Sequence, residues 1–310
     1  MGIKDFFKIV APNGNTIKDM GTLMTQKDLE SLKGMKIAID APAILHGAIR
    51  GMPNIETMMH EGKITSYLNV IFFNVMQFIR LGIHQVWVFD GKPPSIKMGE
   101  LAKRKKNRED ATKKAKKEKD AEKVKKLKKI AYKFEDYIYV DTQRLLTRMG
   151  ITWVVAPEEG EAYASYLNKN GDVDYVWSLD ADCFMFGAKQ VIRPTKDGKK
   201  KVYYVYDRAD ILKQLDITEA QFLLMGICMG TDFSEKIARI GAKTVVGKIG
   251  QHFNLTDAQK LALKYFKNAP HKGAMIHKST FDKAKLTKFL LRRGFNLGRL
   301  ASHIEELEKN

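Results

Sequence analysis

Short apolar runs rich in Val and Ile alternate along the chain with segments whose apolar residues recur every three to four positions. The first pattern predicts buried strands, and the second predicts amphipathic helices. Strands are expected at residues 35–39, 85–89, 151–155 and 175–179. Because each run is apolar enough to be buried on both faces, the pattern favours a parallel sheet covered by helices. The sequence therefore predicts an α/β fold with a central, mostly parallel sheet flanked by helices.

Two further strands are expected at residues 190–193 and 202–206, with a Lys-Asp-Gly-Lys turn at residues 196–199 between them. After Asp232 the chain is expected to be helical, with breaks near Gly241, Gly247, Gly250 and the Ala269-Pro270 pair. Residues 281–307 have the pattern of two amphipathic helices separated around Gly294.

The segment from Lys103 to Lys129 differs from the rest of the chain, because it holds 15 basic and 5 acidic residues and no apolar face. It contains no Gly or Pro, so a helix is compatible with it. A helix that is polar all round is marginal without a partner, however. We therefore expect disorder here that becomes helical when the segment binds an anion.

The composition favours a polyanionic partner. The 310 residues include 54 Lys and Arg against 36 Asp and Glu, a formal net charge of +18, and such a field attracts nucleic acid. An ordinary Lys-rich composition is the alternative. No uncharged apolar run approaches the roughly 20 residues of a membrane span, and the N-terminus lacks the order of a secretory signal. The two cysteines, Cys183 and Cys228, suggest neither a disulfide framework nor a zinc site and fit a reducing interior. We expect an intracellular protein without a membrane partner.

Acidic residues follow three of the predicted strands. Asp40, Asp90 and Asp180 each come at the carboxyl end of a buried run. Ligands bind at that edge of an open parallel sheet. If the three strands are parallel neighbours, the three acids share one rim.

Three more acids lie close to that rim in sequence. Asp180 and Asp182, two apart in an extended segment, would point the same way. Glu159 and Glu161 would be separated on a regular helix, so the preceding Pro157 favours an irregular helix start for them. Two like charges about 4 Å apart repel by about 4 kcal/mol at an effective dielectric constant of 20, so a cluster needs cations.

All-oxygen sites of this kind suit Mg²⁺ or Mn²⁺, and two such ions can hydrolyse a phosphodiester. The alternative is that each acid is an unrelated helix cap or loop residue. The repeated placement after buried strands favours the metal site.

The chain resembles the flap endonuclease family of structure-specific 5′ nucleases, of XPG/Rad2 type, nearly from end to end. The segments that carry the resemblance are Met1-Gly2-Ile3, Ala38-Ile39-Asp40-Ala41, Val88-Phe89-Asp90-Gly91-Lys92-Pro93-Pro94, Ala156-Pro157-Glu158-Glu159-Gly160-Glu161-Ala162, Ser178-Leu179-Asp180-Ala181-Asp182-Cys183 and Gly230-Thr231-Asp232. The resemblance implies a PIN-like nuclease fold in a single domain. Within it, residues 1–95 and 136–232 would form the nuclease parts, 96–135 a helical gateway and cap, and 233–310 a helical region with a helix–two-turn–helix element.

The resemblance also implies a mechanism and a set of ligands. Two Mg²⁺ ions, for which Mn²⁺ can substitute, would cut one phosphodiester at the base of a 5′ flap, and 5′ ends would be trimmed exonucleolytically. Asp180 would be both a ligand and a catalytic residue. The full ligand set carried over is Asp40, Asp90, Glu159, Glu161, Asp180, Asp182 and Asp232, of which the family alone supplies Asp232.

Lys97 and Arg104 match the two basic catalytic residues of the family. Seven residues make almost two helical turns, so both side chains would share a face pointing at the metals and would steady the scissile phosphate. Without the family match they are two more solvated cations. The lysines beyond Arg104 would form an arch that attracts single-stranded DNA, although any individual lysine there fits a solvated helix equally well.

The helix–two-turn–helix of the family resembles residues 237–244, where a helix N-terminus would offer amides to phosphate. Arg239 replaces a usual glycine, and Lys236 replaces a small hydroxyl residue that helps to bind a potassium ion in the family. His46 stands where the family generally has a base-stacking tyrosine. The DNA-contacting positions implied are Gly2, His46, Lys92, Lys103, Gly241, Lys243 and Thr244.

Several partners and functions remain open at this stage. Branched or flap DNA is the expected partner, no sliding-clamp motif is found at the C-terminus, and a monomer is expected. The function implied lies in DNA replication, repair or recombination. Two alternatives are a catalytically silent scaffold that binds branched DNA and a related nuclease that acts on bubbles or on RNA 5′ ends.

Overall fold

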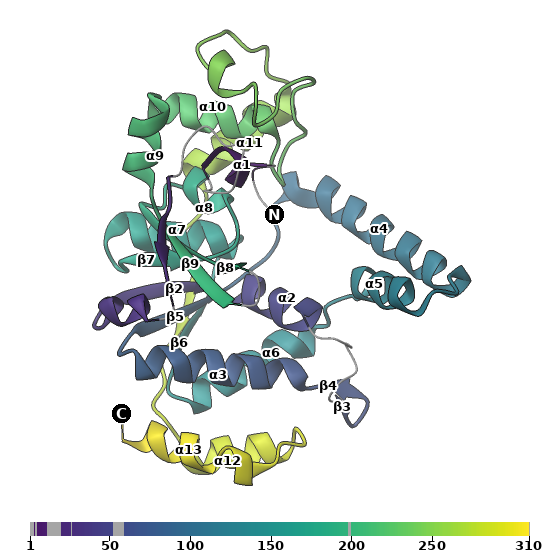
Figure 1. Cartoon of the computed structure of the whole chain (residues 1–310), viewed down its shortest axis with the longest axis vertical. Helices are drawn as coiled ribbons and strands as arrows, with labels where there is room; N and C mark the ends of the chain where they lie inside the picture. The colour runs from purple at the N-terminus through teal and green to yellow at the C-terminus, as the bar shows by residue number, and fades with distance from the viewer. Residues whose placement is uncertain are drawn as a thin grey trace. The chain divides into compact units, whose positions relative to one another are not determined.

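A computed structural model describes residues 3, 5–10, 20–25, 27–51, 59–197 and 200–309. The chain forms two compact units, each assembled from segments that are distant in sequence (Figure 1). The first unit comprises Met1–Asp40, Leu81–Lys97 and Val155–Met275. The second comprises Ala41–Arg80, Met98–Val154 and Ile276–Asn310.

The first unit contains a twisted sheet with the neighbour order β1-β9-β8-β7-β2-β5. Its strands are β1 (Thr22–Met24), β2 (Lys36–Asp40), β5 (His84–Phe89), β7 (Tyr175–Trp177), β8 (Gln190–Asp197) and β9 (Lys200–Asp207). The run β5, β2, β7 and β8 is parallel, whereas β9 pairs antiparallel with β8 and β1 pairs antiparallel with β9. The predicted mostly parallel sheet is confirmed, and so is the hairpin, in which Asp197 pairs with Lys200.

Helices cover this sheet because its central strands are apolar on both faces. Ile37, Ala38 and Ile39 of β2 have no exposed surface. Helix α7 packs against β2, β5 and β7 (Figure 1). The helices and 3₁₀ turns of this unit are α1 (Phe7–Val10), η1 (Asp28–Leu32), η2 (Ser95–Lys97), α7 (Gly160–Asn170), α8 (Asp182–Met185), α9 (Arg208–Leu215), α10 (Glu219–Met229), η3 (Val246–Lys248) and α11 (Asp257–Asn268).

The chain between α10 and α11 is less helical than the sequence predicts. Its one regular element is the single turn η3, Val246–Lys248. Gly230, which ends α10, has φ +86° and Arg239 has φ +64°, so neither residue can continue a right-handed helix. The three glycines of residues 241–250 further lower the propensity for helix in this stretch. The prediction of a mainly helical segment directly after Asp232 is therefore wrong, and regular helix resumes only at α11.

The second unit is built mainly from helices. Helix α6 contacts both α3 and α12, and α3 also contacts α2. The helices and 3₁₀ turn are α2 (Ala41–Gly51), α3 (Ser66–Arg80), α4 (Met98–Lys117), α5 (Ala121–Ala131), α6 (Asp136–Arg148), α12 (Lys283–Leu291), η4 (Leu297–Arg299) and α13 (Ala301–Glu308). The two amphipathic helices predicted near the C-terminus are confirmed as α12 and α13, with Gly294 at φ +77° between them.

Short strands complete the second unit. The strands β3 (Met59–His60) and β4 (Lys63–Ile64) form a hairpin. The strands β6 (Thr152–Val155) and β10 (Met275–His277) are neighbours, and the rings of Trp153 and His277 stack with centroids 3.8 Å apart. The strand predicted at residues 151–155 is thus confirmed as β6.

The Lys-rich segment is helical in the structure, which corrects the expectation of disorder. Helices α4 and α5 pack against each other (Figure 1). The carboxylate of Asp120 accepts hydrogen bonds from the backbone amides of Glu122 and Lys123 and so caps α5. Ala111 of α4 is 4% exposed, so its methyl group is buried. Among the described residues, no helix is long and apolar enough to span a membrane.

Candidate metal centre

Parallel pairing brings the carboxyl ends of β2 and β7 together. Asp40 is the last residue of β2, and Ser178 follows β7 directly. The Ser178 hydroxyl donates a hydrogen bond to Asp40 Oδ2 (2.6 Å) and accepts one from the Asp180 amide (3.0 Å). Ser178 thereby joins the two acids across neighbouring strands. Sequence reasoning missed this serine, although its position between a buried strand and an aspartate was a signal for it.

Asp180 and Asp182 are held together by a turn and not by the extended segment that the sequence predicts. Asp182 is the first residue of α8, and its amide donates to Asp180 Oδ1 (3.0 Å). Asp180 is 3% exposed and Asp182 is completely buried. The two carboxylates are neighbours as expected, but a hydrogen-bonded turn and not strand alternation brings them together.

The start of α7 contributes two more acids, and the irregular helix start predicted for them is confirmed. Glu159 is the N-cap residue with an extended backbone (φ −77°, ψ 128°), and Glu161 lies in the first turn. The Gly160 amide donates to Asp90 Oδ1 (2.8 Å), and a Cβ atom at Gly160 would lie 2.9 Å from that oxygen. Asp90, which follows β5, therefore reaches the helix start because residue 160 has no side chain.

Gly91 allows the same close approach from the other side. A Cβ atom there would lie 2.1 Å from the Ala156 carbonyl oxygen, which no side chain could tolerate. The Ala156 amide donates to the Phe89 carbonyl (2.9 Å). The segment after β5 and the segment before α7 are thus fixed against each other.

Lys97 lies among these acids. It is 8% exposed, its ammonium forms an ion pair with Glu159, and Nζ lies 3.8 Å from Asp232 Oδ2. The ring of Phe233 lies 5.6 Å from the ammonium. Asp232, which only the family resemblance supplied, is therefore a neighbour of the other acids through Lys97.

Lys97 and Arg104 lie in adjoining elements and not in one α-helix, and a shared face toward the metals stays a prediction. Lys97 ends η2, and α4 begins one residue later at Met98. Arg104 belongs to α4 of the second unit, where its Nε donates to Glu100 Oε1 (3.1 Å).

Burial shifts the protonation of the acids toward the neutral form. Burial raises the pKa of Glu159 to about 7, although Lys97 partly opposes this. Burial, with the negative charge of Asp180, raises the pKa of Glu161 well above its usual range. Burial and the charge of Asp180 also raise the pKa of Asp182 strongly. For Lys97, burial alone would lower the pKa, but the charges of Glu161, Glu159 and Asp232 raise it above its ordinary value. The site therefore has an excess of negative charge.

Several buried carboxylate oxygens have no hydrogen-bond donor. Both oxygens of Asp182 and Oε1 of Glu161 are buried without a partner. An unpaired buried carboxylate is costly, and a divalent cation with oxygen ligands compensates such charge. No three Asp, Glu, His or Cys side chains in the part of the chain that the structure describes converge closely enough to hold an ion as they stand. Carboxylates repel one another, so they are expected to lie apart when no cation is between them. The donor set fits hard divalent cations.

The predicted DNA-contacting residues are placed in several parts of the molecule. Gly2 lies outside the described residues. Lys92 is exposed just after Asp90, and Lys103 is exposed on α4. His46 of α2 packs on Phe134, with ring centroids 3.9 Å apart, so one face of the imidazole already has an aromatic neighbour.

The residues expected in the helix–two-turn–helix lie in a turn. The Thr244 hydroxyl accepts a hydrogen bond from the Gly241 amide (3.1 Å), and the Thr244 amide donates to the Gly241 carbonyl (2.9 Å). Lys243 is exposed in the same turn. The α-helix N-terminus expected directly after Gly241 does not form, because only the three-residue η3 follows. The Gly241 amide and carbonyl thus both form hydrogen bonds within the turn.

Two family descriptions match the chain: "XPG N-terminal domain" over residues 1–111 and "XPG I-region" over residues 150–232. Flap endonuclease 1 of Methanococcoides burtonii is 36% identical over 253 residues, which are 76% of this chain and 75% of that protein. Flap endonuclease 1 of Staphylothermus marinus is 32% identical over 318 residues, which cover 92% and 91% of the two chains.

Solved structures agree with this relationship. Flap endonuclease-1 from Methanococcus jannaschii superposes with a TM-score of 0.72 at 27% identity, over 99% of this chain and 98% of that one. The catalytic core of Rad2 in complex with DNA substrate gives a TM-score of 0.73 at 18% identity, over 99% and 100%, and supports the fold. The motif residues that meet around Lys97 lie within or between the two matched regions. The chain belongs to the flap endonuclease family of XPG/Rad2-type nucleases.

Proposed function

We propose that this protein is a structure-specific 5′ flap endonuclease that cuts one phosphodiester at the base of a flap and also trims 5′ ends exonucleolytically. It would use two Mg²⁺ ions, which Mn²⁺ can replace. The observation that carries the proposal is the set of buried, unpaired carboxylate oxygens of Glu161 and Asp182 beside the ammonium of Lys97. Cleavage of branched DNA would serve replication, repair or recombination.

Some residues of the site would hold the cations, and others orient those ligands. Divalent cations, when bound, supply an activated water and neutralise charge on the leaving oxygen. The carboxylates that would hold them are Asp40, Asp90, Glu159, Glu161, Asp180, Asp182 and Asp232. Ser178 orients Asp40 and Asp180 through its two hydrogen bonds, and the Gly160 amide orients Asp90.

Lys97 supplies positive charge at the same place. Its Nζ contacts Glu159 and lies 3.8 Å from Asp232. A scissile phosphate that entered the site could accept from this ammonium as charge develops on its oxygens. Burial of the ammonium strengthens such an interaction, since less water screens it. Arg104 would act on the same phosphate.

A catalytically silent DNA-binding scaffold is the less favoured reading. Seven acids repel phosphate, and a protein that only binds DNA gains nothing from burying five of them. Hydrogen bonds through Ser178 link Asp40 to Asp180, and the ion pairs of Lys97 link Glu159 to Asp232. We further propose that the protein acts as a monomer, which sedimentation of the full chain would test.

The test compares Asp180→Asn with the parent on labelled flap, nicked, bubble and single-stranded substrates, in DNA and in RNA, with Mg²⁺, Mn²⁺ or EDTA. Flap cleavage by the parent with metal and its loss in the variant are expected. The exposed acid Glu30 gives a matched control, since Glu30→Gln removes the same charge elsewhere in the first unit. A variant that cuts flaps as fast as the parent contradicts the proposal. Preferred cutting of bubbles or RNA indicates the related nuclease, and binding without cleavage in either metal indicates the scaffold.

A further inference from the structure

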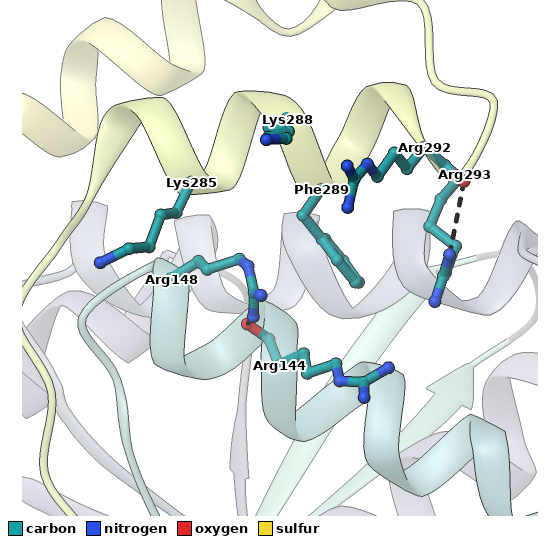
Figure 2. Close-up of a pocket in the computed structure, with 7 residues that line it drawn as sticks. All are labelled: Arg144, Arg148, Lys285, Lys288, Phe289, Arg292 and Arg293. Carbon is teal, nitrogen blue, oxygen red and sulfur yellow. Dashed lines mark hydrogen bonds between the residues drawn. The ribbon is translucent and has the colours of Figure 1, made fainter.

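A strongly basic cleft lies between helices α6 and α12 of the second unit. Its volume is about 400 Å³, and its walls carry cations from both helices around one aromatic ring (Figure 2). Among the described residues, no acidic side chain lines it. The lining residues are Arg144, Arg148, Lys285, Lys288, Phe289, Arg292 and Arg293.

Some of these cations are neutralised from outside the cleft. Asp141 accepts two hydrogen bonds from Arg293, each 2.7 Å long, and one from Arg144 at 3.3 Å. Lys285 Nζ lies 2.9 Å from Asp282. Within the described part of the chain, Lys288 and Arg292 form no ion pair, and both are exposed. The cleft therefore keeps uncompensated positive charge.

Phe289 organises the centre of the cleft. Its ring is 6% exposed and points from α12 toward α6 (Figure 2). The guanidiniums of Arg148 and Arg293 lie 5.0 and 5.3 Å from the ring centroid, within the range of a cation–π contact. Arg148 also donates to the Arg144 carbonyl (2.8 Å), which fixes its orientation. Burial lowers the pKa of Arg148, and the charges of Arg144 and Arg293 add to this effect.

The exposed cations of α12 form a line. Lys285, Lys288 and Arg292 are spaced by three and four residues, so they lie on one face of the helix. The line extends over about 10 Å at 1.5 Å per residue. A nucleic-acid strand carries one phosphate per about 3.4 Å of helix axis, so about three phosphates match this length. A single small anion would match one end of the line only.

We propose that this cleft is an auxiliary site for the phosphate backbone of a DNA arm, separate from the carboxylates of the first unit. Arg148, Lys288 and Arg292 contact phosphates there, and Phe289 holds the guanidiniums in place. The inference rests on the proposed function only in taking DNA as the source of the phosphates. It predicts an effect on binding without an effect on the chemical step.

The test uses the full chain with Lys288→Gln and Arg292→Gln combined. Anisotropy of a labelled unbranched duplex in Ca²⁺ measures affinity across a salt series without relying on cleavage. The matched control combines Arg299→Gln and Lys309→Gln, which removes two exposed cations of the same C-terminal stretch outside the cleft. We expect Kd to rise about tenfold in the test variant, and the salt slope to fall by about 1.8, since each phosphate contact contributes about 0.9. The control should change Kd less than twofold.

Arg144→Gln approaches the cleft from α6 and should weaken binding in the same direction, while thermal unfolding checks that each variant is folded. With flap DNA, KM should rise while kcat at saturating DNA stays unchanged. If the parent cleaves nothing, the duplex measurement still stands, so failure of the proposed function is distinguishable. Equal losses in test and control variants, or parental affinity in the test variant, overturn the inference. A second measurement uses sodium pyrophosphate as a competitor of the duplex. If the test variant loses pyrophosphate binding but keeps the parental affinity for duplex, the cleft binds a free anion and not DNA.

Discussion

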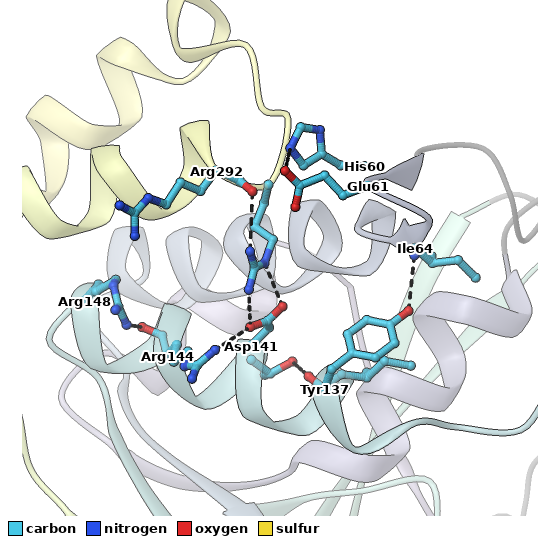
Figure 3. Close-up of polar contacts among 11 residues, drawn as sticks. His60, Glu61, Ile64, Tyr137, Asp141, Arg144, Arg148 and Arg292 are labelled. Atoms are coloured by element: carbon cyan, nitrogen blue, oxygen red, sulfur yellow. Dashed lines mark hydrogen bonds and ion pairs between the residues drawn. The ribbon is translucent and has the colours of Figure 1, made fainter.

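Arg293, just after the end of α12, donates two hydrogen bonds to the carboxylate of Asp141 on α6, each 2.7 Å long. Figure 3 shows the Asp141 side chain with the hydrogen bonds that reach it. The Asp141 side chain is 3% exposed, whereas that of Arg293 is 23% exposed. Parallel hydrogen bonds from one guanidinium to one carboxylate are geometrically specific. This pair therefore fixes the packing of α12 against α6 within the second unit.

Asp141→Ala should reduce the free energy of unfolding by about 3 kcal/mol, because Arg293 loses its partner at a buried position. Urea unfolding of parent and variant measures the change. The exposed pair of Lys283 and Glu308, with Nζ and Oε2 2.7 Å apart, gives the control. Glu308→Ala should cost less than about 1 kcal/mol. Equal losses of unfolding free energy in the two variants would contradict a larger contribution from the pair of Asp141 and Arg293.

Asp182→Asn should stabilise the protein in EDTA while it abolishes cleavage. Both oxygens of Asp182 are buried without a hydrogen-bond partner, so the neutral amide removes an uncompensated charge. A gain of about 1 kcal/mol is expected when a strained functional charge is removed. The Tm in EDTA and in Mg²⁺ measures it. The parent should gain Tm on addition of Mg²⁺, and the variant should gain less.

Lys97→Ala should lower kcat for flap cleavage by about 100-fold, since one preorganised charge on a developing oxyanion contributes on that order. Lys97→Arg keeps the charge and should retain more activity than the alanine variant. Lys33 is an exposed lysine of the same unit, and Lys33→Ala should have little effect. Single-turnover rates at saturating DNA separate this effect from binding. An unchanged rate in Lys97→Ala would remove Lys97 from the catalytic set.

The strand ends of the site could be predicted because buried strands have a simple pattern. Asp40 and Asp90 follow apolar runs, and parallel pairing of such runs puts their carboxyl ends on one edge. Pro157 and the spacing of Glu159 and Glu161 likewise gave the irregular helix start. These predictions depend on local sequence and on one topological rule.

Other parts of the site depend on tertiary contacts that no local pattern carries. Asp232 lies near the acids because Lys97 bridges it to Glu159. The sequence of the Lys-rich segment predicts disorder, yet α4 and α5 are helical because they pack on each other. The single helix assumed for Lys97 and Arg104 is divided, because Lys97 ends the 3₁₀ turn η2 and α4 begins only at Met98. Only pairing between distant segments decides such features.

His46 should make stability depend on pH in the acidic range. Burial lowers the pKa of His46 from 6.5 to about 4, with smaller effects of Arg50 and Arg104. The unfolded state then binds more protons than the folded state between these values. The contribution is fully present above about pH 6.5 and is lost as the pH falls toward 4, by up to about 3 kcal/mol.

His46→Phe keeps an aromatic ring beside Phe134 and should flatten the stability curve between pH 6.5 and 4. Urea unfolding at several pH values measures the slope. Substitution of the exposed His252 by Phe should leave the slope as in the parent. If the His46 variant keeps the parental slope, another group causes the acid sensitivity. The same variant tests whether the imidazole has a separate role in binding a base, since flap affinity is measured independently.

Arg239→Gly should stabilise the turn after α10, because Arg239 has φ +64°, where a Cβ atom is unfavourable and glycine is not. The strain relieved is about 1 to 2 kcal/mol, partly offset by the greater entropy of glycine in the unfolded chain, so a net gain of about 0.5 kcal/mol is expected. Gly241→Ala is the matched control, since a Cβ atom there meets nothing within 4 Å and its φ is not positive. That control should leave the stability of the fold unchanged or slightly increased. A flap-binding defect in Gly241→Ala, with its fold intact, would then show that the space at Gly241 is used by DNA and not by the protein.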